Sequence, residues 1–210
     1  MNPTASASNP PPAHDALASS EFPAGSEFAA VSQVAAVSEV AATVERLCAT
    51  VPDYPTPGIV FKDLTPVFAH GQALQQVVEA IVSHFDGKFD AVAGVEARGF
   101  LLAAAVAHAS QTGVITIRKA GKLPRAVFAQ SYALEYGEAT LELHQDDILP
   151  GTRVLILDDV LATGGTLGAA ASLLERTGAV VAGIGVVLEI DALPGRRNLP
   201  GRDIHSLLHV

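Results

Sequence analysis

Residues 154–166 read VLILDDVLATGGT, and this stretch decides the fold class. Its first four residues are continuously apolar and rich in branched side chains, as a parallel strand covered on both faces requires. Asp158 and Asp159 follow at the carboxyl end of that strand, which is where open α/β sheets bind their ligands. The stretch therefore predicts an α/β fold with a ligand site at this strand end.

A loop of small residues follows the carboxylates and precedes a helix that we expect over 167–177. The loop consists of Ala162, Thr163, Gly164, Gly165 and Thr166. Small side chains let backbone N–H groups approach an anion, and a helix N-terminus adds its dipole. The loop lacks the Gly-Lys-Ser/Thr ending of a Walker A loop and the Gly-x-Gly-x-x-Gly order of a dinucleotide site. It therefore predicts a phosphate site outside the commonest nucleotide-binding classes.

The two carboxylates narrow the choice of ligand. Ionised carboxylates only accept hydrogen bonds, so they suit hydroxyl donors. Together with the loop, Asp158 and Asp159 suit a ligand that has a 5-phosphate at one end and vicinal ribose hydroxyls nearby. The alternative is an ordinary strand–loop–helix connection with solvated acids. Two acids at the end of an apolar strand carry a desolvation cost that packing does not explain, which favours the ligand site.

The composition favours one domain of an acidic protein. The chain has 210 residues with 49% hydrophobic content, enough for a single substantial core. Its net charge of −9 argues against general binding to nucleic acid or to a membrane surface. Cys48 is the one cysteine, so we expect a reducing, cytoplasmic setting. No apolar run approaches the roughly 18 residues of a spanning helix.

The first 28 residues differ from the rest of the chain. They are rich in Ala, Ser and Pro and contain no Lys or Arg, so we expect a disordered tail. The first basic residue is Arg46, which fits neither a secretory signal nor an Arg-rich transit peptide. We expect residues 29–210 to form a single domain.

Hydrophobic periodicity predicts alternating strands and helices over that domain. After a helix that ends near Cys48, helices are expected over 73–84, 99–109 and 167–177, and strands over 91–95, 114–117, 152–157 and 180–188. Two alternating stretches, 126–131 and 139–143, predict a two-stranded flap. Residues 52–57 contain three prolines and are expected to be irregular. The succession of βα units predicts a mainly parallel, twisted sheet with helices on both faces.

Five segments together resemble the type I phosphoribosyltransferases, and within that family the members that use adenine. Besides 154–166, the segments are PDYPTPGIVFKD at 52–63, GVEARGF at 94–100, IRKAGKLP at 117–124 and SYALEYG at 131–137. The resemblance covers about residues 45–208. It implies the type I phosphoribosyltransferase fold with a small flap or hood. It also implies an enzyme that makes AMP and pyrophosphate from adenine and phosphoribosyl pyrophosphate.

The resemblance implies where phosphoribosyl pyrophosphate binds. Loop 162–166 would hold the 5-phosphate, and Asp158 and Asp159 the ribose hydroxyls. The pyrophosphate loop would contain Glu96, Ala97 and Arg98, with a strained peptide at Glu96–Ala97; the family commonly has Asp where Glu96 stands. Further contacts would come from Arg118, Lys119, Lys122 and Tyr136. The family forms homodimers in which some of these cations serve the neighbouring subunit, so Arg118 and Lys122 are candidates to act across the dimer.

The resemblance also implies the adenine site and the catalytic groups. Backbone groups of Val60 and Lys62 would read the base while Phe61 stacks on it, although Phe61 also fits an ordinary core aromatic. Arg98 and Leu188 would form further walls. Glu135 and Arg98 would be catalytic. Glu135 would donate a proton at adenine N7, which requires burial to raise its pKa from an ordinary value of about 4.3.

The resemblance implies Mg²⁺ that arrives with phosphoribosyl pyrophosphate and has few or no direct protein ligands. The seven histidines show no spacing typical of a metal site. Two alternative functions remain. An enzyme for hypoxanthine, guanine or xanthine disagrees with the segments at 60–63 and 131–137. A DNA-binding regulator that senses phosphoribosyl pyrophosphate would need a basic module, and no Lys or Arg precedes Arg46.

Overall fold

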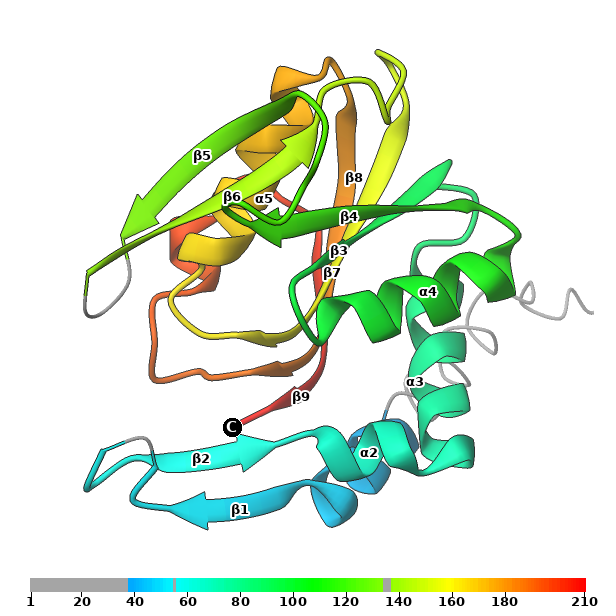
Figure 1. Cartoon of the computed structure of the whole chain (residues 1–210). Helices are drawn as coiled ribbons and strands as arrows, with labels where there is room; N and C mark the ends of the chain where they lie inside the picture. Colours follow the sequence, from blue (N-terminus) through cyan, green and yellow to red (C-terminus); the bar gives the residue numbers. More distant parts are fainter. Residues whose placement is uncertain (1–37, 55, 134–136) are drawn as a thin grey trace, which may run out of the picture.

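A computed structural model describes residues 38–54, 56–133 and 137–210 of the chain (Figure 1). Its centre is a seven-stranded sheet with the strand order β5-β6-β4-β3-β7-β8-β9. The central strands are β3 (Ala91–Val95), β4 (Gly113–Lys119), β7 (Arg153–Leu161), β8 (Val180–Glu189) and β9 (Ile204–His209). Neighbours within this group are parallel, which confirms the mainly parallel sheet.

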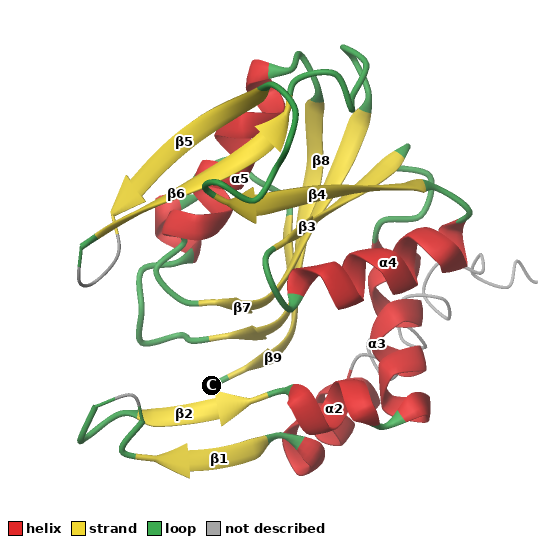
Figure 2. Ribbon diagram, viewed as in Figure 1, coloured by secondary structure: helices red, strands yellow, loops and turns green. Residues whose placement is uncertain are grey.

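Helices cover both faces of the sheet, as expected (Figure 2). Because side chains alternate along β7, Leu155 packs with α3 (Gly71–His84) and α4 (Gly99–Ser110). Ile156 packs on the opposite face with α5 (Gly165–Arg176). A helix over 38–47 and α2 (Thr65–Ala69) contribute to the same apolar core as Leu155, α3 and α4. Two apolar layers therefore fix the sheet and the loops at its edge.

The predicted flap is part of the same sheet. β5 (Val127–Ala133) and β6 (Glu138–His144) pair antiparallel over seven residues each. β6 also pairs with the end of β4, through Arg118–Glu142 and Lys119–Leu141. The flap is thus anchored to β4, whose last two residues, with Lys122 after them, form the basic cluster (Arg118, Lys119 and Lys122).

A separate hairpin precedes α2. β1 (Ala49–Pro52) and β2 (Val60–Asp63) pair antiparallel, with Pro52 opposite Val60. The expectation that all of 52–57 is irregular was wrong at Pro52. A proline can end a strand on the edge of a sheet, where its missing N–H costs no ladder bond. Figure 1 shows this hairpin beside the C-terminal end of β9.

β9 was not predicted from the sequence. Its apolar pattern is interrupted by His205 and Ser206, which hides the strand from a reading of periodicity. A short 3-10 helix, η1 (Arg196–Asn198), lies between β8 and β9. Within the described ranges, no helix is both long enough and apolar enough to cross a membrane.

Candidate active site

β7 runs further than predicted and carries both acids within the strand. Its last pair with β3 is Gly94–Leu157, whereas its pairing with β8 continues to Leu161. Asp158 therefore begins the part of β7 that β3 no longer flanks. The start of α4 packs there: a Cβ atom on Gly99 would lie 2.5 Å from the Leu157 carbonyl oxygen. Only glycine allows helix and strand to approach so closely.

The two neighbouring acids have different surroundings. Asp159 accepts a hydrogen bond from Arg98 Nε, and its side chain is only 10% exposed. Asp158 accepts the Asp159 backbone N–H at 2.9 Å. Burial, together with the neighbouring Asp159 charge, raises the pKa of Asp158 well above its ordinary value. Asp159 is therefore the paired anion, and Asp158 the acid whose charge is disfavoured without a ligand.

The phosphate loop has the backbone geometry that an anion site needs. Gly164 has a φ of +82° and is the N-cap of α5, with no side-chain cap. The first amides of α5 are thus free of a capping side chain, as a phosphate requires. A Cβ atom on Gly165 would lie 3.2 Å from the Ala133 carbonyl oxygen, so the end of β5 lies over this loop. Gly164 is thus needed for the backbone shape of the loop, and Gly165 for its close packing against β5.

A turn that sequence reasoning missed supports this loop. Asn198 Nδ2 donates to the Thr163 carbonyl oxygen at 2.8 Å. A Cβ atom on Gly164 would lie 2.6 Å from the Gly195 carbonyl oxygen. In the sequence, the only signal is the pair Pro194-Gly195, which indicates a turn but no role.

The predicted pyrophosphate loop, residues 96–98, is tied to the end of β4. The peptide bond between Glu96 and Ala97 is cis, at the position where the resemblance implied a strained peptide. Glu96 Oε2 accepts the Lys119 backbone N–H at 3.0 Å and Arg118 Nε at 3.3 Å. The Lys119 N–H, with a smaller effect of the Arg118 charge, lowers the pKa of Glu96. Glu96 thus binds one protein cation, Arg118, and one backbone amide directly.

The basic cluster is also held in place. Arg118 Nη1 donates to the Lys122 carbonyl oxygen at 3.2 Å, and Glu142 accepts the Gly121 N–H at 2.9 Å. Lys119 and Lys122 are exposed. The structure therefore brings these cations to the same edge of the sheet as Arg98, with Lys119 and Lys122 open to solvent.

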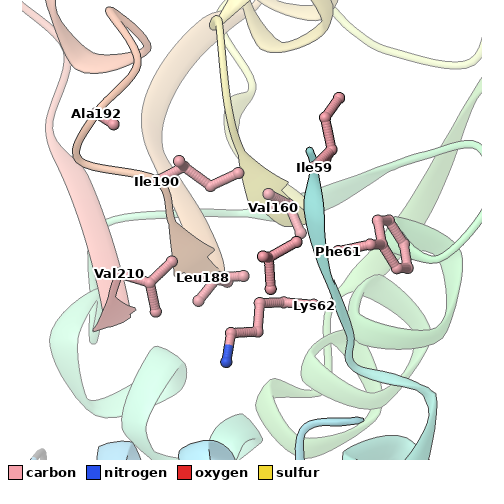
Figure 3. A pocket seen from close by; sticks show the side chains of 9 residues that line it. Ile59, Phe61, Lys62, Val160, Leu188, Ile190, Ala192 and Val210 are labelled. Carbon is pink, nitrogen blue, oxygen red and sulfur yellow. The ribbon is translucent and has the colours of Figure 1, made fainter. Parts of the chain in front are cut away.

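A cavity of about 350 Å³ lies between the hairpin and the ends of β7 and β8. It is lined by Ile59, Val60, Phe61, Lys62, Val160, Leu188, Ile190, Ala192 and Val210 (Figure 3). Four of the five predicted adenine contacts are in this set, and Arg98 is not. The lining is almost entirely apolar, as the flat face of a base requires.

Phe61 and Lys62 point to opposite sides of β2 in Figure 3, as the pleat of a strand dictates. The Phe61 ring contacts Tyr54 edge-on, with ring centres 5.2 Å apart. Lys62 Nζ donates to Thr50 Oγ1 at 3.0 Å. The Lys62 side chain thus braces the hairpin, which leaves its backbone as the part that can read a base.

Glu135 and Tyr136, the predicted flap residues, lie outside the described residues. In the described part of the chain, one group has the proximity of a metal site: Glu189, Asp191 and His209 lie within 4.8 Å of one another. Glu189 already accepts from Arg196 and Ser206, so this group is an ion-pair cluster.

Comparison with known proteins agrees with this geometry. The phosphoribosyl transferase domain matches residues 64–199. The adenine phosphoribosyltransferase of Arthrobacter sp. (strain FB24) is 69% identical over 167 residues, which cover 80% of this chain and 90% of that protein. The chain belongs to the adenine phosphoribosyltransferase family. The corresponding protein of Renibacterium salmoninarum is 66% identical over 167 residues, covering 80% and 92%.

Solved structures of adenine phosphoribosyltransferases have the same fold. The enzyme of Thermoanaerobacter pseudethanolicus superposes with a TM-score of 0.78 and 42% identity, covering 80% of this chain and 99% of that chain. The Saccharomyces cerevisiae enzyme, solved with adenine and an imino-altritol bisphosphate, has a TM-score of 0.78 at 34% identity, covering 81% and 99%. The expected type I phosphoribosyltransferase fold is thereby confirmed. The domain match begins at residue 64, so the hairpin with the predicted base contacts Val60, Phe61 and Lys62 lies before it.

Proposed function

We propose that the enzyme transfers the phosphoribosyl group of phosphoribosyl pyrophosphate to adenine, giving AMP and pyrophosphate. One observation carries this reaction: β7 supplies the ribose acids and a wall of the base cavity from consecutive residues. Asp159 bonds Arg98, and Val160 lines the apolar cavity together with Leu188, its neighbour on β8. The phosphate loop follows directly. Surfaces that suit a ribose, a flat base and a phosphate thus all lie within residues 158–166.

Phosphoribosyl pyrophosphate would bind along the carboxyl edge of the sheet. The amides of 163–166 would hold its 5-phosphate, and Asp158 and Asp159 would accept its ribose hydroxyls. The pyrophosphate would lie toward the cations at the carboxyl ends of β3 and β4, which are Arg98, Arg118, Lys119 and Lys122. Several donors are needed because the pyrophosphate carries multiple charges and the chain as a whole is acidic.

Adenine would enter the cavity at the hairpin. The backbone of Val60 and Lys62 would read its edge, and Leu188 would lie against its face. The Phe61 ring points away from the Lys62 side of β2, so stacking on Phe61 needs the base on the side of the hairpin that faces Tyr54. Stacking on Phe61 therefore remains a prediction.

The chemistry needs little covalent help from the protein. The bond between ribose C1 and the pyrophosphate oxygen breaks as adenine N9 approaches, and the ribosyl group becomes oxocarbenium-like. The Asp159 carboxylate beside the ribose would stabilise that positive charge, while the cations would stabilise the departing pyrophosphate. Glu135 would donate a proton to adenine N7 while the N9–H proton leaves to the departing pyrophosphate, and it would take the N7 proton back once the bond between N9 and C1 has formed.

The donor set fits Mg²⁺ held mainly by substrate. Asp159 is engaged by Arg98, and burial disfavours the charged form of Asp158, so neither is a free ligand for a bare cation. Mg²⁺ prefers phosphate oxygens and water, and would neutralise pyrophosphate charge when bound. Asp158 and Asp159 would then contact it through water.

We further propose a homodimer in a reducing, cytoplasmic setting. α4 is mostly apolar, and Leu101 on its outer face is 54% exposed. Such a helix is normally buried, so a second copy is a fitting cover. Light scattering on wild-type protein and on Leu101→Glu tests this directly. A monomeric wild type would exclude the homodimer.

The cysteine content fits the proposed cytoplasmic setting. Cys48 is the one cysteine, so the chain can form no internal disulfide, as is usual in a reducing compartment.

An activity assay tests the reaction. Purified protein is incubated with phosphoribosyl pyrophosphate, Mg²⁺ and one purine at a time, and nucleotides are separated by chromatography. We expect AMP from adenine and at least about 100-fold less product from hypoxanthine, guanine or xanthine. Comparable IMP or GMP formation would favour the other purine class. Absence of any nucleotide, with a gel shift of DNA, would favour the regulator.

A further inference from the structure

The turn between β8 and β9 touches three consecutive residues of the phosphate loop. Asn198 Nδ2 donates to the Thr163 carbonyl oxygen at 2.8 Å. The Gly195 carbonyl oxygen lies so close to Gly164 that a Cβ atom there would be 2.6 Å away. A Cβ atom on Gly195 would in turn collide with the Ala162 carbonyl oxygen. Residues 162–164 of the loop therefore pack against the turn at 195–198.

This turn is itself fixed by side chains outside the site. Arg196 donates Nη2 and Nε to the two carboxylate oxygens of Glu189 at 2.7 and 3.0 Å, and Nη1 to the Ile204 carbonyl at 3.1 Å. The Glu189 side chain is 7% exposed, and the Arg196 fork holds its pKa below the ordinary range. Ser206 on β9 donates to the same carboxylate. β8 and β9 thus hold Arg196 in place, and with it the turn that carries Asn198.

The contact fixes the orientation of one peptide plane in the loop. In a trans peptide, the carbonyl oxygen of one residue and the N–H of the next point in opposite directions. In the described residues, the one cis bond is Glu96–Ala97, so the Thr163–Gly164 peptide is trans. With the Thr163 oxygen bound to Asn198, the Gly164 N–H points away from the turn. Gly164, at a φ of +82°, supplies the backbone shape that this orientation needs.

We infer that Asn198 is a positioning residue for the 5-phosphate: it holds the Thr163–Gly164 peptide so that the Gly164 N–H faces the phosphate. This inference rests on the proposed function, because it assumes that the loop binds a 5-phosphate. Asn198 does not touch the substrate in this arrangement. Its loss leaves the peptide free to rotate and removes one oriented donor from the phosphate.

The ligands of the reaction separate this role from general support of the fold. Phosphoribosyl pyrophosphate and AMP both carry a 5-phosphate, whereas pyrophosphate binds at the other end of the site. Isothermal titration calorimetry on Asn198→Ala should show phosphoribosyl pyrophosphate and AMP bound about three- to tenfold more weakly, as expected for one hydrogen bond. Pyrophosphate affinity and kcat should stay within about twofold, while the KM for phosphoribosyl pyrophosphate rises.

Two further variants sharpen the test. Asn198→Asp keeps the shape but presents an acceptor to the Thr163 carbonyl, so it should weaken the same two ligands at least as much. Arg197→Ala, an exposed neighbour on the same turn, is the matched control and should bind all three ligands like wild type.

The outcomes are distinct. Wild-type affinity for AMP and phosphoribosyl pyrophosphate in both Asn198 variants overturns the inference, and so does an equal loss for pyrophosphate, which would mean general loosening of the site. If Asn198→Ala does not fold, the isosteric Asn198→Asp decides on the same criteria. If the wild-type protein binds neither AMP nor phosphoribosyl pyrophosphate, the proposed function itself fails.

Discussion

Arg98 and Asp159 form an ion pair that joins the loop after β3 to the end of β7, across 61 residues of sequence. The acid is 10% exposed and the arginine side chain 41% exposed, so the pair is buried at its anionic end. Asp63, at the end of β2, is also close to Arg98: Thr65 lowers the pKa of Asp63 most, and the Arg98 charge adds to the effect. The end of β7, the loop after β3 and the hairpin thus meet at one guanidinium.

Replacing Asp159 with Asn should impair use of phosphoribosyl pyrophosphate. The amide keeps the shape but loses the charge that binds Arg98 and the ribose, a hydrogen bond worth about 1.5–3 kcal/mol. Steady-state kinetics should show kcat or the KM for phosphoribosyl pyrophosphate worse by about one to two decades. Wild-type kinetics in both Asp158→Asn and Asp159→Asn would sink the assignment of these acids to the ribose.

Replacing Asp158 with Asn should stabilise the free enzyme while it harms catalysis. Burial raises the pKa of Asp158, so the folded state disfavours its charge. The wild type therefore loses stability as pH rises from the unfolded value of about 3.9 through the raised folded pKa. Thermal melts near neutral pH should place Asp158→Asn higher by about 2–4 °C per kcal/mol of relieved penalty. The gap should close in acid, and Asp→Asn at exposed Asp146 should show no such gap.

Glu135, in the flap outside the described residues, should act as a proton donor to adenine. Glu135→Gln keeps the size and a hydrogen-bond donor but cannot transfer a proton. Its kcat should fall by about 100-fold or more, with little change in the KM for phosphoribosyl pyrophosphate. Glu135→Ala should be at least as damaging. If the Gln variant keeps nearly full kcat and only Ala is impaired, Glu135 positions the base and the acid role is wrong.

His205 should make the fold sensitive to mild acid. Its ring stacks on His84 at 3.9 Å, near Asp203, Lys88 and Arg196. Burial, reinforced by the His84 charge, lowers the pKa of His205 to about 4. The unfolded chain takes up the proton near the unperturbed value of about 6.5, so stability is complete above that pH and is lost toward the folded pKa.

Denaturant unfolding across that pH window checks this expectation. His205→Phe keeps a flat ring against His84 but cannot titrate, so its free energy of unfolding should fall less on acidification than that of wild type. His70→Asn is the matched control, since it removes a histidine yet keeps an acceptor at the N-cap of α3. Equal pH slopes in wild type and His205→Phe would contradict the assignment.

The first 28 residues should be dispensable for chemistry. They lack the apolar periodicity needed to pack against the domain. Deleting them should leave kcat/KM nearly unchanged in the same assay. A loss of about tenfold or more would show that the tail contributes to the site or to the dimer.

The sequence by itself determined the parallel core, and it placed two acids and the loop of small residues 162–166 together at one strand end. Each depends on local patterns: a branched apolar run for the strand of 154–157, and small residues for 162–166. The predicted strand 91–95 and helix 73–84 agree closely with β3 (Ala91–Val95) and α3 (Gly71–His84) for the same reason. Periodicity reports which face of an element is buried, so it suffices for elements whose whole length packs on one core.

The tertiary structure decided what each of these residues contacts. Asp158 and Asp159 are equivalent in sequence, yet only the fold shows that Asp159 pairs with Arg98 and that burial raises the pKa of Asp158. Asn198 carries no motif, because its partner Thr163 lies 35 residues earlier and is reached only once β9 aligns beside β8. Such contacts depend on how distant segments close on one another, which local propensity and spacing do not encode.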